Sequence, residues 1–97
     1  MRRRYLITYD VSDDKRRTGV FKTLMARGDH VQFSVFLCEL SDREKAELRD
    51  QLRGHVHPRT DQVLVIDLGT AERALEIGKD LECIGQSYVP ASRVLVV

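Results

Sequence analysis

Several common features are absent from this chain of 97 residues. It has no tryptophan, only two prolines, and no catalytic signature of the Ser–His–Asp, P-loop or G-x-G-x-x-G kind. The chain also lacks a large excess of positive charge, because 16 basic residues are offset by 15 acidic ones. That balance argues against a protein that coats nucleic acid through bulk charge, although it leaves room for a local basic patch.

Signals for secretion, membrane insertion and zinc binding are absent as well. No apolar run approaches the ~20 residues of a membrane span, and the run after the MRRR start is too short for a signal peptide. Cys38 and Cys83 lack a CxxC or Cys/His spacing, and His55 and His57 have no third ligand at a useful spacing. We therefore expect a cytoplasmic protein with reduced thiols and no contact with a membrane.

Hydrophobic periodicity predicts a strand, a helix and a second β region in the first half. Residues 4–11 form an apolar, β-prone run. Ser12 is the expected N-cap of the helix that follows, and Gly28 is its expected stop. Residues 30–40 alternate with period two, which fits either one long strand or two short strands that fold back near Ser34.

The second half begins with a clear helix signal. Ser41 and Glu44 form an S-x-x-E capping box, and Gly54 is expected to end the helix that they open. Residues 62–68 are predicted to form a buried strand that stops at Gly69.

Weaker signals follow this strand. Thr70 is expected to cap a short helical segment, and residues 83–86 and 93–97 are β-prone.

This order of elements predicts an α+β fold of the ferredoxin-like, split βαβ type. Two helices would lie on one face of an antiparallel sheet, in a single domain over residues 1–97 with its core at about 4–68. The other sheet face is apolar too and would need a cover, for which a second copy is the simplest candidate. Residues 69–97 would form a dimerisation segment whose last strand extends the partner's sheet.

One combination of motifs resembles a known family. The Y-D-V-S-D-D start, the arginine pair after it, the glycine after the first helix and the V-Q-F-S-V-F run are similar to the CRISPR-associated Cas2 family. The resemblance is close over residues 5–40 and rests on element order and length beyond them. It implies a homodimer of the spacer-acquisition machinery that partners the spacer integrase and binds double-stranded DNA or single-stranded RNA.

Asp10, at the end of the first strand, is the candidate catalytic residue and metal ligand. The resemblance implies that the Asp10 residues of two subunits face each other across the twofold axis and share Mg²⁺ or Mn²⁺. Hard divalent cations take oxygen ligands and can promote attack on phosphorus. The alternative is that Asp10 only bonds the amides of the turn before the helix.

Four arginines are candidate nucleic-acid ligands. Arg16 and Arg17 could clamp phosphates, and because 100° separates neighbouring helical residues, only one is expected to face the site; the motif match favours Arg17. Arg3 and Arg4 would add a patch that follows the phosphate backbone. For each of them the alternative is a solvated surface position. The family often has an arginine where this chain has Gly19, a departure that counts against catalysis more than against the fold.

Three further residues complete the predicted site. Ser34 would orient a metal-bound water, and Phe36 would either wall the site and stack a base or belong to the core. Tyr9 precedes Asp10 but points to the opposite sheet face, so we expect it to pack.

These residues support three hypotheses of function. The first is a metal-dependent endonuclease that leaves a 5′-phosphate and a 3′-hydroxyl. The second is a non-catalytic scaffold that holds DNA for the integrase, and the third is a ferredoxin-like regulatory module that binds a metabolite between subunits.

Overall fold

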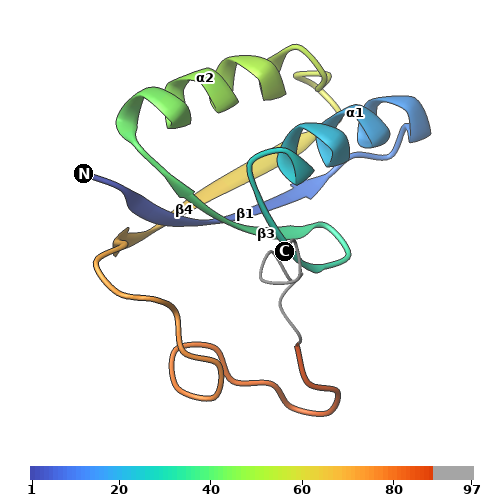
Figure 1. Cartoon of the computed structure of the whole chain (residues 1–97). Helices are drawn as coiled ribbons and strands as arrows, with labels where there is room; N and C mark the ends of the chain where they lie inside the picture. Colours follow the sequence, from blue (N-terminus) through green and yellow to red (C-terminus); the bar gives the residue numbers. More distant parts are fainter. Residues whose placement is uncertain (89–97) are drawn as a thin grey trace, which may run out of the picture.

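The computed structural model describes residues 1–88 and contains one antiparallel sheet with two helices. The strand order is β2-β3-β1-β4, and both helices cover the same face of the sheet (Figure 1). The predicted ferredoxin-like α+β fold is therefore confirmed. Along the chain the elements are β1 (Arg3–Asp10), α1 (Asp14–Met25), β2 (Gly28–Gln32), β3 (Val35–Leu40), α2 (Asp42–Arg53) and β4 (Gln62–Thr70).

The core lies between the helices and the sheet. Alternate residues of β1 face the helices and are buried, and β3 contributes every second residue in the same way. Each fully buried large apolar side chain stabilises the fold by about 1.5–3 kcal/mol. The core comprises Tyr5, Ile7, Tyr9, Val11, Val20, Leu24, Phe36, Cys38, Leu40, Leu48 and Leu52.

The ends of α1 differ from the prediction at both termini. Its N-cap is Asp13 instead of Ser12, because the Asp13 carboxylate accepts a hydrogen bond from the backbone N–H of Arg16 at 2.9 Å. The helix ends at Met25, so the predicted stop at Gly28 is wrong. Gly28 instead opens β2, where the absence of a side chain lets the backbone approach β3.

The capping box of α2 is confirmed. The Ser41 hydroxyl accepts from the backbone N–H of Glu44 at 3.2 Å, and the Glu44 carboxylate accepts from the backbone N–H of Ser41 at 2.8 Å. Gly54 caps the other end of the helix, as predicted.

The region 30–40 contains two strands rather than one. β2 and β3 pair antiparallel around a turn at Phe33 and Ser34. Phe33 has a positive φ of 21°, and a ring nitrogen of His30, Nε2, lies 2.7 Å from the Phe33 carbonyl oxygen across the turn. The alternative in which the chain folds back near Ser34 is therefore confirmed.

The predicted end of β4 at Gly69 and the predicted helix after Thr70 were both wrong. β4 runs through Gly69 to Thr70, and the N–H of Ala71 still donates to the carbonyl of Arg2 at 3.0 Å. The expected helix after Thr70 does not form. Residues 83–86 form no strand, and residues 93–97 lie outside the described part of the chain.

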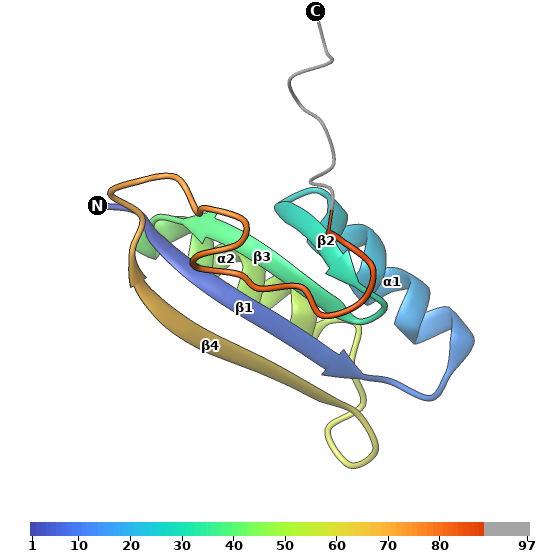
Figure 2. The same ribbon diagram turned by 90° about the horizontal axis from the view of Figure 1, so that it is seen from below.

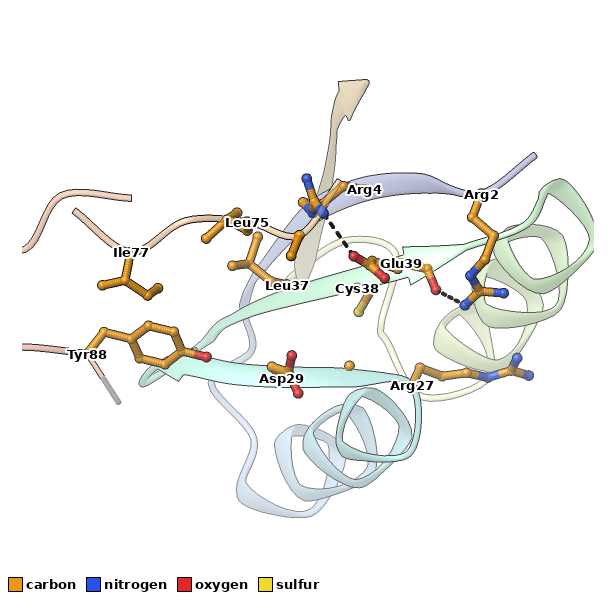
Figure 3. Close-up of a pocket in the computed structure, with 12 residues that line it drawn as sticks. Arg2, Arg4, Arg27, Asp29, Leu37, Cys38, Glu39, Leu75, Ile77 and Tyr88 are labelled. Carbon is orange, nitrogen blue, oxygen red and sulfur yellow. Dashed lines mark hydrogen bonds and ion pairs between the residues drawn. The ribbon is translucent and has the colours of Figure 1, made fainter. Parts of the chain in front are cut away.

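The face of the sheet without helices is partly covered by the following segment. Residues 71–88 cross this face (Figure 2), and the guanidinium of Arg4 donates to the Arg73 carbonyl at 2.6 Å. A cavity of about 350 Å³ separates the segment from the sheet, with Leu75, Ile77 and Tyr88 on one side and Leu37 on the other (Figure 3). None of the helices among residues 1–88 has the length and apolarity that crossing a membrane requires.

Candidate functional site

Asp10 is the last residue of β1 and pairs with Gln62, the first residue of β4. Its carboxylate is exposed and makes no hydrogen bond or ion pair with any other residue in 1–88. The turn-bonding alternative is wrong, because the helix amide is capped by the carboxylate of Asp13 instead. A solvated, unengaged carboxylate at a strand end is available to a ligand.

The Arg17 side chain wraps around the turn that follows Asp10. Its guanidinium donates to the carbonyl oxygens of Val11 at 3.0 Å and Ser12 at 3.2 Å, and it pairs with the carboxylate of Asp14. It also comes close to Tyr9: burial raises the pKa of the Tyr9 hydroxyl, and the positive charge of Arg17 opposes that shift. Arg17 therefore holds the turn in place while remaining partly exposed beside it.

Arg16 points to the loop before β4. Its guanidinium donates to the carboxylate of Asp61 at 2.7 Å, and the Asp61 side chain is fully buried by the loop. That bond, helped by the backbone N–H of His57 at 2.8 Å, lowers the pKa of Asp61 to about 2. Sequence reasoning missed Asp61, because its partner lies 45 residues away.

Arg3 and Arg4 lie at the other end of β1. Arg4 lies six steps along the extended strand from Asp10, a distance of about 20 Å. Arg3 donates to the Asp67 carboxylate at 3.0 Å, and Arg4 donates to the Glu39 carboxylate at 2.9 Å. The structure therefore does not bring these two arginines together with Asp10, and it engages both within the sheet.

The three supporting residues lie near Asp10 but differ in exposure. Tyr9 packs into the core on the opposite face from Asp10, as expected, and its N–H donates to the Ser34 carbonyl at 3.1 Å. Ser34 is partly buried in the β2–β3 turn. Phe36 is fully buried, so the core interpretation is confirmed and its ring is not available to stack a base.

An exposed aromatic ring at this end of the sheet belongs to Phe33, which is 94% exposed. Sequence reasoning assigned Phe33 to a strand and missed it. The period-two alternation continues through the turn in the sequence, and no glycine or asparagine marks it.

A second group consists of cations on the helix layer and the loop after it, which the sequence prediction did not assign to nucleic-acid binding. These side chains are exposed and form no ion pair with residues in the described range. Unpaired cations are the ones that can release counterions from a phosphate backbone. They include Lys15, Lys22, Arg49, Arg53 and Arg59.

Asp10 fits a hard divalent cation as one of few protein ligands. Within residues 1–88 no three histidine, cysteine, aspartate or glutamate side chains gather into a metal-binding cluster. Mg²⁺ keeps several waters and is often held by one or two carboxylates together with substrate phosphates. The donor chemistry of Asp10 is compatible with that mode of binding.

Comparison with known sequences identifies similar proteins over most of the chain. A family model described as CRISPR associated protein Cas2 matches residues 1–74. A Rhodospirillum rubrum protein named CRISPR-associated endoribonuclease Cas2 1 is 33% identical over 93 residues, which cover 96% of this chain and 88% of the relative. A Thermus thermophilus protein named CRISPR-associated endonuclease Cas2 2 is 32% identical over 97 residues, which cover 99% and 97% of the two chains.

Solved structures are also similar to this chain over most of its length. A hypothetical protein from Thermus thermophilus superposes with a TM-score of 0.76 at 29% identity, covering 93% of this chain and 99% of its own. The Streptococcus pyogenes Cas2 structure superposes with a TM-score of 0.71 at 28% identity, covering 84% and 99%.

Proposed function

The chain belongs to the CRISPR-associated Cas2 family, and we propose that it is a metal-dependent endonuclease. Its substrate would be a phosphodiester of single-stranded RNA, double-stranded DNA or both. It would act in the cytoplasm in spacer acquisition, as a homodimer that partners the spacer integrase. Relatives named endoribonuclease and endonuclease support the reaction class.

The observation that carries the proposal is the state of Asp10. An exposed carboxylate without a protein partner in residues 1–88 has no evident structural role, and the helix cap that could have occupied it belongs to Asp13. Asp10 would hold Mg²⁺ or Mn²⁺ together with Asp10 of the second subunit. When bound, the metal would stabilise negative charge on a phosphoryl oxygen and lower the pKa of a water.

The other residues of the site would position the substrate. Arg17 stabilises the turn after Asp10 and keeps one partly exposed guanidinium beside it, where it can bind a phosphate. The unpaired cations of the helix layer and its loop would contact more distant phosphates. Arg16 would act indirectly, because its bond to buried Asp61 fixes the loop that leads into β4.

The homodimer is supported by the exposed apolar side chains of β4. Leu64, Ile66 and Leu68 are 47%, 43% and 50% exposed and lie on the sheet face without helices. β4 is also an edge strand, which leaves one row of its backbone groups free for another chain. A second subunit packed on this face would cover the apolar side chains and bring a second Asp10 to the site.

The experiment compares wild type with Asp10→Asn on labelled single-stranded RNA and duplex DNA, with Mg²⁺, Mn²⁺ or EDTA. We expect metal-dependent cleavage by wild type and a loss of at least about 100-fold in the variant. Folding should be unchanged, because Asp10 has no partner to lose within residues 1–88. Asp50→Asn, which changes an exposed carboxylate on α2, is the matched control. Equal cleavage by both variants would refute the role of Asp10.

The non-catalytic scaffold is the second candidate. It is favoured by Gly19 at a position where the family often has an arginine, and by the engagement of Arg16 with Asp61. In that case neither protein cleaves, both bind duplex DNA, and spacer integration survives Asp10→Ala.

A further inference from the structure

The β2–β3 turn and the middle of α1 line an open cavity of about 440 Å³. Its lining includes the rings of Tyr9, Phe21, His30 and Phe33, with Arg17 and Thr18 at the helix side. Tyr9 immediately precedes Asp10, so the cavity lies beside the end of β1. We propose that this cavity, together with the exposed ring of Phe33, binds one unpaired base of a single-stranded nucleic acid. The inference rests on the proposed function and specifies its substrate.

The aromatic rings form a rigid floor and wall. Phe21 meets His30 edge to face, with ring centres 5.2 Å apart at 89°. His30 in turn stacks on buried Phe36, with ring centres 4.8 Å apart at 23°. Rings held by their neighbours lose little conformational freedom when a flat ligand packs against them, which favours stacking of a base.

The backbone of Phe33 has an unusual conformation, and its side chain is exposed. Its φ of 21° is rarely adopted by residues other than glycine, and its side chain is 94% exposed instead of packed. The Phe33 carbonyl can only accept a hydrogen bond, so His30 Nε2 carries the proton that bonds it at 2.7 Å. The turn therefore directs the apolar side chain of Phe33 to solvent at the mouth of the cavity.

Polar groups around the cavity match the edge and the phosphate of a nucleotide. With Nε2 bonded to Phe33, His30 keeps Nδ1 without a partner in residues 1–88. Thr18 and Arg17 line the helix side; the Thr18 hydroxyl donates to the Asp14 carbonyl at 2.8 Å and keeps its oxygen as an acceptor. The Arg17 side chain, bonded to the turn and to Asp14, stays 44% exposed and supplies the positive charge for a phosphate. An apolar peptide side chain would use the rings but none of these groups, so the combination favours a base with its attached phosphate.

A base inside a duplex cannot enter this cavity, because it is already stacked and paired and would have to flip out. The proposal therefore separates single strands from duplexes. Phosphate contacts elsewhere on the protein serve both, whereas the Phe33 cavity contributes to single-strand affinity alone.

The test measures binding of a fluorescent single-stranded RNA and of a duplex DNA in EDTA at fixed salt, so that no cleavage occurs. We expect Phe33→Ala to weaken single-strand binding about tenfold and to leave duplex binding unchanged, with Phe33→Trp restoring the affinity. Alanine keeps a Cβ, so the backbone strain at this position is the same in variant and wild type. Met25→Ala removes a half-exposed apolar side chain of α1 outside the cavity and is the matched control.

A second readout reports stacking directly. A 2-aminopurine base placed in the strand should be quenched by wild type and by Phe33→Trp, and much less by Phe33→Ala. Unchanged single-strand affinity in Phe33→Ala would overturn the base site, leave the proposed nuclease standing, and point to a protein partner for Phe33. Equal losses for single strand and duplex would overturn it as well. Wild type that binds neither nucleic acid would refute the proposed function itself.

Discussion

Replacing Gly28 by alanine should destabilise the protein through a steric clash in the sheet. Gly28 opens β2 and pairs with Cys38 of β3. A Cβ at position 28 would lie 2.4 Å from the Cys38 sulfur and 2.5 Å from the Leu37 carbonyl oxygen. Both separations are about 1 Å shorter than ordinary contact, and one of the opposing atoms belongs to the backbone.

The size of the effect follows from how little the surroundings can yield. Cys38 is buried, and the Leu37 carbonyl belongs to a paired strand, so β2 must shift away from β3. Overpacking of this kind costs about 1–3 kcal/mol in the free energy of unfolding. For a domain of this length, each 1 kcal/mol lowers the melting temperature by roughly 4–8 °C.

Urea unfolding at fixed protein concentration measures the change, because self-association makes stability depend on concentration. Cys38→Ala provides a second background, in which the sulfur clash is absent but the carbonyl clash remains. Gly28→Ala should therefore still destabilise that background, by less than in wild type. Gly54→Ala, at a helix end with φ of −70°, is the control and should change stability little. A Gly28→Ala protein as stable as wild type would show that β2 does not approach β3 so closely.

Two further predictions concern Asp61 and β4. The pKa of Asp61 is lowered to about 2 in the folded protein, so its ion pair with Arg16 stabilises the fold above about pH 4 and this contribution disappears as the pH falls towards 2. Asp61→Asn should be less stable than wild type at pH 7, with the difference shrinking below pH 4 in chemical unfolding; a difference that is constant with pH would contradict the assigned pKa. Ile66→Glu places a charge on the proposed dimer face and should weaken self-association about 100-fold or more in sedimentation equilibrium. Met25→Glu on the helix layer is its control, and an unchanged dimer in Ile66→Glu would exclude this face as the interface.

Local signals predicted the parts of the fold that local contacts determine. The α2 helix was predicted at both ends, because the capping box of Ser41 and Glu44 is satisfied within four residues. The extension of β4 to Thr70 was missed because it depends on pairing with Arg3, 67 positions earlier in the chain. The weak helical pattern after Thr70 does not prevail, because the chain stays bonded to β1 there and the N–H of Ala71 donates to the carbonyl of Arg2 at 3.0 Å.

The same distinction applies to the candidate site. Asp10 was predicted because a carboxylate after a strand and before a basic helix is visible in a short stretch of sequence. The partners of the arginines were not, since Asp61, Asp67 and Glu39 are distant in the chain and adjacent only in the folded sheet. The positive charges of Arg3, Arg4 and Arg16, which the sequence offers to nucleic acid, are therefore paired with carboxylates in the folded protein.

Gly19 shows how packing restricts what this site can contain. A Cβ at position 19 would lie 2.4 Å from Nδ1 of His55, in the loop after α2. The same loop is held to α1 by the bond between Arg16 and Asp61, so α1 and the loop approach each other at two neighbouring points. An arginine at position 19 would require His55 to move away, and this chain has a glycine there instead. Arg17 is therefore the arginine of α1 that lies beside Asp10. Its contacts with the turn fix its position and its exposure lets it bind a phosphate, and both the nuclease and the scaffold would need these two properties.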